Sequence, residues 1–189
     1  MARPLEFDRC EAVARAQALF LRNGYEATSI DDLTQALGIS RASLYNSFGD
    51  KRSLMIEALS AAEDDGEQMR EAACGRRCGA KKIVRDIFEK LVDANMQKAD
   101  GRGCFLLTLG AELASGDEEV KRRVAVSLEA SRLMFAEILA REENLTRRQI
   151  EAKSAGLLGT MVSLLMLVRV HPDKKLLGDL ITQGLSILD

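Results

Sequence analysis

Residues 28–51 of this 189-residue chain carry side chains that could read DNA. Leu44 and Phe48 share one face of a predicted helix, whereas Ala42 and Asn46 lie on the opposite face. Small side chains let a helix enter the major groove of double-stranded DNA, and an asparagine amide can hydrogen-bond to a base edge. This spacing therefore favours sequence-specific DNA binding.

The polar side chains around this face are suited to base edges or to the phosphate backbone. Ser43 lies on the face, and Tyr45 and Arg41 flank it. Lys51 begins the next predicted helix, where its charge and the free N–H groups of a helix start could meet one phosphate. For Ser43 and Asn46 the alternative is a solvated helix face without a ligand.

Helices are the elements that must position these residues. Apolar residues recur at steps of three and four along almost the whole chain, and no alternating β-branched run is present. Helix boundaries are expected where Ser, Thr or Asp caps a start and where Gly or Pro ends a run. The expected helices run from Phe7 to the Asn23-Gly24 stop, from Ser29 to Leu37, from Ser40 to the Gly49-Asp50 stop, from Lys51 to Ala73, from Ala80 to Lys98, from Cys104 to Ala114, from a Ser115–Glu118 capping box, from a Thr146–Gln149 capping box, and after His171-Pro172-Asp173.

A short helix, a three-residue turn containing Gly38 and a second short helix together form a helix-turn-helix pattern. We therefore expect an all-α fold of about nine helices in two parts. Residues 1–48 are predicted to form a three-helix, helix-turn-helix DNA-binding domain. Residues 49–189 are predicted to form a helical ligand-binding and dimerisation bundle, joined directly through the helix that begins at Lys51.

The composition is that of an ordinary folded protein, with 27 Lys and Arg against 29 Asp and Glu. Because the formal net charge is −2, any DNA binding must come from a local surface. The amino terminus has no apolar stretch of the kind found in signal peptides, and no apolar run is as long as a membrane-spanning helix. We therefore expect a cytoplasmic protein without a membrane partner, whose four cysteines are reduced thiols.

The first part of the chain resembles the DNA-binding domain of the tetracycline-repressor (TetR) family. The matching features are Ala16, Phe20, Gly24-Tyr25, Thr28-Ser29-Ile30, Ile39-Ser40, Leu44-Tyr45, Phe48 and Lys51. The family often has a phosphate-binding His where this chain has Ser47, which makes Ser47 a weaker candidate contact. With the resemblance included, the predicted DNA-binding residues are Thr28, Ser29, Ser40, Arg41, Ala42, Ser43, Tyr45, Asn46, Ser47 and Lys51.

The resemblance implies a transcriptional regulator, with repression as the expected action. Such a protein would bind a palindromic operator as a homodimer, with one recognition helix in each half-site, and a small-molecule effector would release it. Residues 103–107, 112–114 and 117–120 are similar to one subgroup of the family's regulatory domains, in which Asn often replaces Thr108. The identity of the effector does not follow from this likeness.

Apolar residues in the second part predict an interface and a pocket. Two helical stripes need a partner surface, and a two-fold dimer is the commonest solution, with the core of a single chain as the alternative. The stripes are Leu157, Met161, Leu164 and Val168, followed by Leu177, Ile181, Gly184 and Leu188. A mainly apolar effector pocket is expected, with ordinary core packing as the alternative for each member. Its predicted residues are Phe88, Cys104, Leu107, Thr108, Leu133, Met134 and Met161.

Cys104 lies at a predicted helix start, where the helix dipole and the neighbouring Arg102 would lower the pKa of its thiol. A repressor that senses electrophiles or oxidants through Cys104 is therefore an alternative, and a small buried hydrophobe is another. Cys74 and Cys78 lack the further ligands that a zinc site needs, so no metal or cofactor is expected. No group of residues predicts catalysis, so we do not expect an enzyme. A helical ligand-binding module without DNA binding is the competing class.

Overall fold

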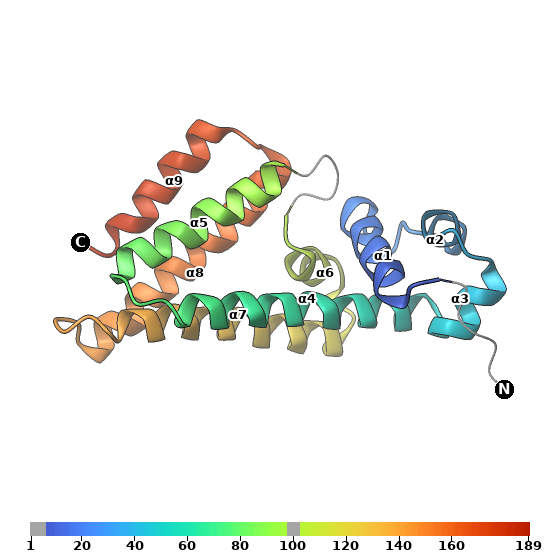
Figure 1. Ribbon diagram of the computed structural model, residues 1–189, viewed down its shortest axis with the longest axis horizontal. Helices are drawn as coiled ribbons and strands as arrows, with labels where there is room; N and C mark the ends of the chain where they lie inside the picture. Colours follow the sequence, from blue (N-terminus) through green and yellow to red (C-terminus); the bar gives the residue numbers. More distant parts are fainter. Residues whose placement is uncertain (1–6, 98–102) are drawn as a thin grey trace.

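The computed structural model describes residues 7–97 and 103–189, which form nine α-helices and contain no strand (Figure 1). The expected all-α fold is therefore confirmed for these residues. The helices are α1 (Arg9–Asn23), α2 (Ile30–Leu37), α3 (Arg41–Phe48), α4 (Lys51–Cys74), α5 (Ala80–Met96), α6 (Phe105–Leu113), α7 (Glu118–Leu139), α8 (Arg147–Val170) and α9 (Lys174–Ser186). Lys98 and Arg102, which entered the sequence predictions, lie outside the described residues.

Local capping chemistry explains where several helices begin. The predicted capping box at the start of α8 is confirmed, because the Thr146 hydroxyl and the Gln149 side chain each bind the backbone N–H of the other residue. The box predicted from Ser115 to Glu118 is wrong. α7 is capped by Asp117, whose carboxylate accepts hydrogen bonds from the N–H groups of Glu119 and Val120. Its negative charge is also attracted to the positive end of the helix dipole.

The helices separate into two ends joined by long elements (Figure 1). The helices α1, α2 and α3 gather at one end of the molecule, and α5, α8 and α9 lie toward the other. The helix α4 runs between the two ends with α7 alongside it, and α6 stands between them. Because α4 contacts α1 and α3, and α6 contacts α1, a movement of α4 or α6 would change the position of these helices.

Two clusters of buried apolar side chains follow this division. The first cluster holds α1, α2 and α3 against α4 as far as Ala62, and it also includes parts of α6 and α7. The second holds α5, α8 and α9 against the C-terminal part of α7. The first core thus continues past residue 48, because Leu54 and Leu59 of α4 are fully buried in it.

The two apolar stripes predicted as the dimer interface are instead part of the second cluster. Leu157, Leu164, Val168 and Leu177 have no exposed surface within a single chain, and their neighbours on the stripes are buried or half-buried. Periodicity marks an apolar face without saying which surface covers it. In this fold α5, α7 and α9 pack against α8, so these stripes form the core of one chain.

The opposite face of α8 carries exposed apolar and small residues. Met166 is 44% exposed and Val170 is 69% exposed, and Gly159 lies on the surface with open space beside it. By length and composition alone α8 could cross a membrane, but core helices of folded proteins meet the same criterion. The packing of its other face against three helices of the chain accounts for its apolar composition.

Candidate nucleic-acid interface

The helix α3 presents the small polar face that its sequence predicts. Gly38 adopts a left-handed conformation (φ 69°) that turns the chain between α2 and α3, and the Ser40 hydroxyl caps α3 by accepting a 3.0 Å hydrogen bond from the N–H of Ser43. Leu44 and Phe48 are buried in the first cluster. The remaining face of α3 is therefore held outward by its own core contacts.

The residues on this outward face have the exposure that DNA contact requires. Ala42 and Asn46 are exposed, and the Tyr45 side chain is 47% exposed beside them. Ala42 and Asn46 lie one helical turn apart on this face. The geometry matches that of a helix able to approach base edges, with Asn46 as its amide donor and acceptor.

Arg41 begins α3 already paired with a carboxylate. Its guanidinium binds Asp31 at the start of α2 through three hydrogen bonds of 2.6–2.9 Å, and this contact raises the pKa of Arg41. Both side chains are exposed, so water and salt screen their attraction. A DNA phosphate would therefore compete with Asp31 for the guanidinium.

The phosphate contact predicted for Lys51 is not the contact that the structure shows. The Lys51 ammonium donates 2.9 Å hydrogen bonds to the carbonyl oxygens of Tyr25 and Thr28, and it lies 4.3 Å from the centroid of the Tyr25 ring. A third, longer hydrogen bond of 3.5 Å reaches the carbonyl oxygen of Glu26. The three donors of the ammonium are thus directed into the turn between α1 and α2, so Lys51 holds this turn.

Thr28 is corrected from a DNA contact to a structural residue. It is fully buried, and its hydroxyl donates a 2.6 Å hydrogen bond to the carbonyl oxygen of Gly24. Ser29 is exposed next to it and caps α2 in a reciprocal capping box with Asp32. Ser47 is half-buried on α3, so a contact with DNA through its hydroxyl is a prediction that this geometry permits.

Arg9 was missed by the sequence-based prediction and organises the end of α3. It donates two 2.7 Å hydrogen bonds to the Glu57 carboxylate on α4 and one of 2.7 Å to the carbonyl oxygen of Ser47. The guanidinium also lies 4.6 Å from the centroid of the Phe48 ring. Because these partners are 38 to 48 residues away in the chain, no local pattern could have identified Arg9.

The residues predicted as an effector pocket lie partly in the core and partly nearer the surface. Phe88, Met134 and Met161 are packed into the second cluster, where the rings of Phe88 and Phe135 meet edge to face with centroids 5.9 Å apart. Leu133 is 52% exposed on the outside of α7, because the burial of its neighbour Met134 turns the two side chains in different directions. Cys104, Leu107 and Thr108 of the α6 region are half-buried.

A cleft between α4 and α5 is a better place for an apolar ligand. Its volume is about 530 Å³, its polar boundary includes Asn95 and the ion pair between Arg76 and Asp86, and it opens to the surface. The apolar residues that line it are Met69, Ala72, Ala73, Ile87, Leu91 and Ala94. None of these six belongs to the predicted set.

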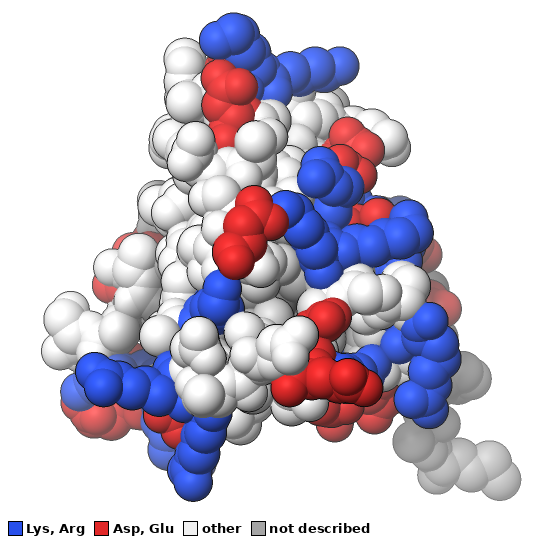
Figure 2. All heavy atoms as spheres, turned by 90° about the vertical axis from the view of Figure 1, so that its left-hand side faces the viewer, with Lys and Arg blue, Asp and Glu red and all other residues white. Residues whose placement is uncertain are grey.

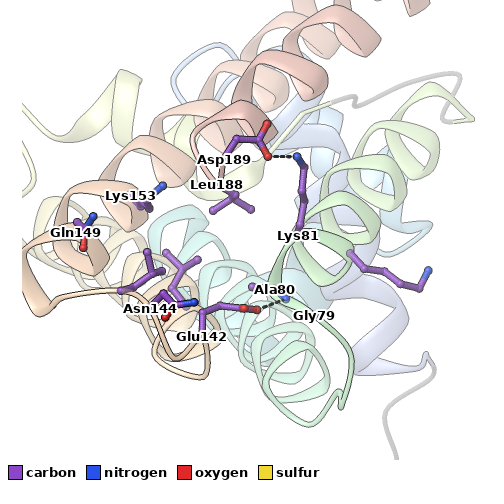
Figure 3. A pocket seen from close by; sticks show the side chains of 12 residues that line it. Gly79, Ala80, Lys81, Glu142, Asn144, Gln149, Lys153, Leu188 and Asp189 are labelled. Atoms are coloured by element: carbon purple, nitrogen blue, oxygen red, sulfur yellow. Dashed lines mark hydrogen bonds and ion pairs between the residues drawn. The ribbon is translucent and has the colours of Figure 1, made fainter.

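A second cavity, of about 500 Å³, lies at the end of the molecule away from α3 (Figure 3). Lys81 forms an ion pair with Asp189 across it, and the Glu142 carboxylate accepts a 2.9 Å hydrogen bond from the N–H of Ala80. Glu142 therefore stabilises the start of α5, where the capping position is Gly79 and has no side chain to do so. Lys81, Asp189 and Glu142 are therefore already paired in this cavity.

The surface around this second cavity does not resemble a DNA-binding surface. Figure 2 shows that Lys and Arg are intermingled with Asp and Glu on this end of the molecule. Binding to the phosphate backbone requires several neighbouring cations. The exposed face of α3 with Ala42 and Asn46 stays the candidate surface for contact with nucleic acid.

The four cysteines are free thiols in different surroundings. Cys104 occupies the capping position of α6 and is half-buried. Burial and a hydrogen bond with Glu137 raise the pKa of Cys74 to about 11, so its thiol stays protonated at neutral pH. A protonated thiol is a poor nucleophile, which makes Cys74 unsuited to electrophile sensing.

Comparison with known proteins gives one consistent result. The family model described as bacterial regulatory proteins of the tetR family matches residues 12–58. The whole chain is 31% identical over 198 aligned residues to YezE of Bacillus subtilis (strain 168), an uncharacterized HTH-type transcriptional regulator, and it covers the full length of that protein. It is also 33% identical over 119 residues to the HTH-type transcriptional repressor ComR of Escherichia coli (strain K12), covering 61% of this chain and 56% of ComR.

Solved structures share the fold along nearly the whole chain. A cysteine-substituted form of the TetR-family regulator CifR, complexed with a 26-bp double-stranded operator DNA, superposes with a TM-score of 0.84 and 24% identity over 98% of each chain. The TetR-family regulator SCO4454 of Streptomyces coelicolor superposes with a TM-score of 0.80 and 23% identity, covering 94% of this chain and 92% of that one.

Proposed function

Because this chain belongs to the tetR family of bacterial regulatory proteins, we propose that it is a cytoplasmic repressor that binds a palindromic DNA operator as a homodimer. The observation that carries this proposal is the outward face of α3, where Ala42 and Asn46 are exposed. The complex of CifR with operator DNA supports it, as does the name of ComR as a repressor. Two recognition helices related by a two-fold axis would read two half-sites.

The proposed dimer uses the outer face of α8. Met166 and Val170 are exposed apolar residues on this face, and Gly159 leaves room for a second helix to approach closely. Apolar side chains arranged along one helix face are stabilised when a second copy covers them. The face identified from the sequence was the buried one, so the proposed interface is rotated about α8 away from those stripes.

The proposed effector is a small, mainly apolar molecule that enters the cleft between α4 and α5. Apolar side chains from both helices line this cleft. A ligand would therefore bind most tightly to the relative position of α4 and α5 in which the cleft matches its shape. A ligand that separates α5 from α4 would also move the helix that follows α3. Filling the cleft by Met69→Trp is expected to abolish the response to such ligands while operator binding persists.

A second mode of release, through Cys104, is favoured by one specific observation. Cys104 occupies the capping position of α6 without a capping hydrogen bond from its side chain, and α6 contributes to both apolar clusters. A thiol alkylator distinguishes the two modes, because it is expected to release wild-type protein and to leave Cys104→Ser bound if the thiol is the sensor. Release of both proteins by the alkylator would remove Cys104 from the mechanism.

Selection of bound sequences from random DNA duplexes tests the proposed function. Wild-type protein is expected to enrich one palindrome. The Asn46→Ala variant should relax the preference at one base pair of each half-site at a cost of about 1–3 kcal/mol. Gln35→Ala, an exposed change on α2, is the matched control and should leave the preference intact. Failure of wild-type protein to enrich any sequence would favour a ligand-binding module without DNA binding.

A further inference from the structure

Glu112, near the end of α6, binds the backbone of a distant turn. Its carboxylate accepts a 2.9 Å hydrogen bond from the N–H of Tyr25 and a 2.7 Å hydrogen bond from the N–H of Glu26. These residues lie between α1 and α2, 86 and 87 positions away from Glu112 in the chain. Two successive N–H groups bound by one carboxylate form a charge-assisted contact with a defined direction.

At Gly24 the backbone of this turn comes close to the Glu112 carboxylate. Gly24 has a φ of +88°, and a Cβ atom on it would lie 3.2 Å from one carboxylate oxygen of Glu112. The positive φ favours glycine at this position, and a side chain here would press on the Glu112 carboxylate. The buried Thr28 hydroxyl closes the turn on the carbonyl oxygen of Gly24, immediately before Ser29 caps α2. The position of the turn therefore sets where α2 begins, and through α2 it sets where α3 lies.

α6 is placed to connect this turn with the regulatory end. Phe105 and Leu109 are buried in the first cluster, whereas Cys104 and Leu107 pack against the second. The position of α6 therefore depends on the packing of both cores. A second connection runs parallel to it, because Arg169 of α8 donates a 2.7 Å hydrogen bond to the carbonyl oxygen of Leu21 near the end of α1.

We propose that Glu112 is a positioning residue for operator binding. It holds the α1–α3 unit in one orientation against α6, and in the dimer this orientation sets the separation of the two recognition helices. Glu112 touches no base, so its loss alters the spacing that is read and leaves the sequence of each half-site unchanged. The spacing effect rests on the proposed dimeric operator binding, whereas the contact itself can be tested without DNA.

The experiment compares full-length wild-type protein with Glu112→Ala, Glu112→Gln and the control Glu118→Gln. Glutamine keeps one acceptor oxygen, but it presents an NH₂ group to the second N–H of the turn. Glu118 is an exposed carboxylate on α7 that pairs only with Lys121 among the described contacts. Each protein is titrated with a single half-site and with palindromes whose spacer length varies by single base pairs, and amide hydrogen exchange is measured without DNA.

Wild-type protein and Glu118→Gln are expected to prefer one spacer length. Glu112→Ala should bind the preferred palindrome about tenfold more weakly, within the usual range for coupling between sites, and should discriminate less between spacers. Its affinity for the single half-site should match that of wild-type protein. Glu112→Gln should fall between the two. A spacer preference in Glu112→Ala identical to that of wild-type protein would overturn the proposal.

Hydrogen exchange separates positioning from general stability. In Glu112→Ala, exchange should accelerate at Tyr25, Glu26 and the amides of α2 and α3, whereas α5, α8 and α9 should keep wild-type rates. Uniform acceleration throughout the chain would assign Glu112 a merely structural role and overturn the proposal, as would unchanged exchange at Tyr25 and Glu26. If wild-type protein bound no palindrome, the proposed function would fail, and the exchange data would still decide whether Glu112 positions α1–α3.

Discussion

Lys51 and Glu112 bind the same turn between α1 and α2, one through its backbone carbonyl oxygens and the other through its backbone N–H groups. The Lys51 ammonium binds the carbonyl oxygens of Tyr25 and Thr28, whereas the Glu112 carboxylate binds the N–H groups of Tyr25 and Glu26. Lys51 belongs to the helix that follows α3, and Glu112 belongs to α6. The turn is thus bound by one residue next to the recognition helix and by one residue from the helix between the two cores.

The first prediction concerns Lys51→Met, which removes the ammonium and keeps an unbranched side chain against Tyr25. The turn loses its charged donor, so the midpoint of thermal unfolding and the affinity for operator should both fall. Because the ammonium binds carbonyl oxygens, the salt dependence of binding should keep its wild-type slope. Operator titrations at several salt concentrations check this, and a slope reduced by about one would instead identify a direct phosphate contact.

The second prediction concerns Asp31→Asn, which removes the carboxylate that binds Arg41. Arg41 would then be free to bind a phosphate, so operator affinity should rise and the salt slope should become steeper by about one. The fold should be unaffected, because the pair is exposed on both sides. The same titrations measure the effect, with Glu118→Gln, an exposed carboxylate on α7, as a charge-matched control. Unchanged affinity and slope would show that Arg41 makes no phosphate contact.

The third prediction concerns the dimer. Apart from the adjoining residues of α8, nothing lies within 4 Å of a Cβ atom built on Gly159, so Gly159→Arg should be tolerated by a single chain. In the proposed dimer the new side chain would obstruct the second copy, and sedimentation should show a mass near the 20.8 kDa of one chain. The control is Gln68→Arg, at an exposed position on α4. A mass of two chains for Gly159→Arg would place the interface elsewhere.

The fourth prediction tests the corrected assignment of the apolar stripe on α8. Leu164 is fully buried within one chain, so Leu164→Ala should create a cavity and lower the free energy of unfolding by about 2–5 kcal/mol. Denaturant titration measures this loss. The protein should remain dimeric where it is folded, because the removed atoms do not face the second copy. Loss of the dimer without loss of stability would restore the interface assignment for this residue.

The fifth prediction concerns acid. Asp32, Asp50 and Asp117 have pKa values lowered chiefly by the hydrogen bonds that they accept from Ser29, from the N–H of Ser53 and from the N–H of Val120, respectively. Because the pKa values are lower in the folded state, the ionised carboxylates contribute their full stabilisation at pH values above the ordinary pKa of 3.8. This stabilisation is lost as the pH falls from there through the lower pKa values of the folded state.

Thermal unfolding between neutral pH and about pH 2 measures this loss, and the relevant window lies below the ordinary carboxylate pKa of about 4. Asp50→Asn retains an acceptor for the N–H of Ser53 and removes the titration, so its unfolding midpoint should depend less on pH than that of wild-type protein. An identical pH dependence in the two proteins would show that the cap of α4 does not contribute.

The sequence by itself determined the helices, several of their caps and the face of α3 that points outward. These features depend on residues within four positions of one another, as in the contact between Ser29 and Asp32 or the burial of Leu44 and Phe48 on one helix face. Short-range hydrogen bonds and helical periodicity are properties of a local segment, so they can be recognised before the fold is known.

Only the tertiary structure decided what lies opposite each of these elements. The stripe containing Leu164 would have the same periodicity if a second chain covered it as it has when α5 and α9 cover it. The position of Lys51 at a helix start did not reveal the carbonyl oxygens that its ammonium binds. Arg9 and Glu112 bind partners between 38 and 87 positions away. Such contacts exist only when distant segments have packed together, so their donors and acceptors carry no local pattern that a sequence can display.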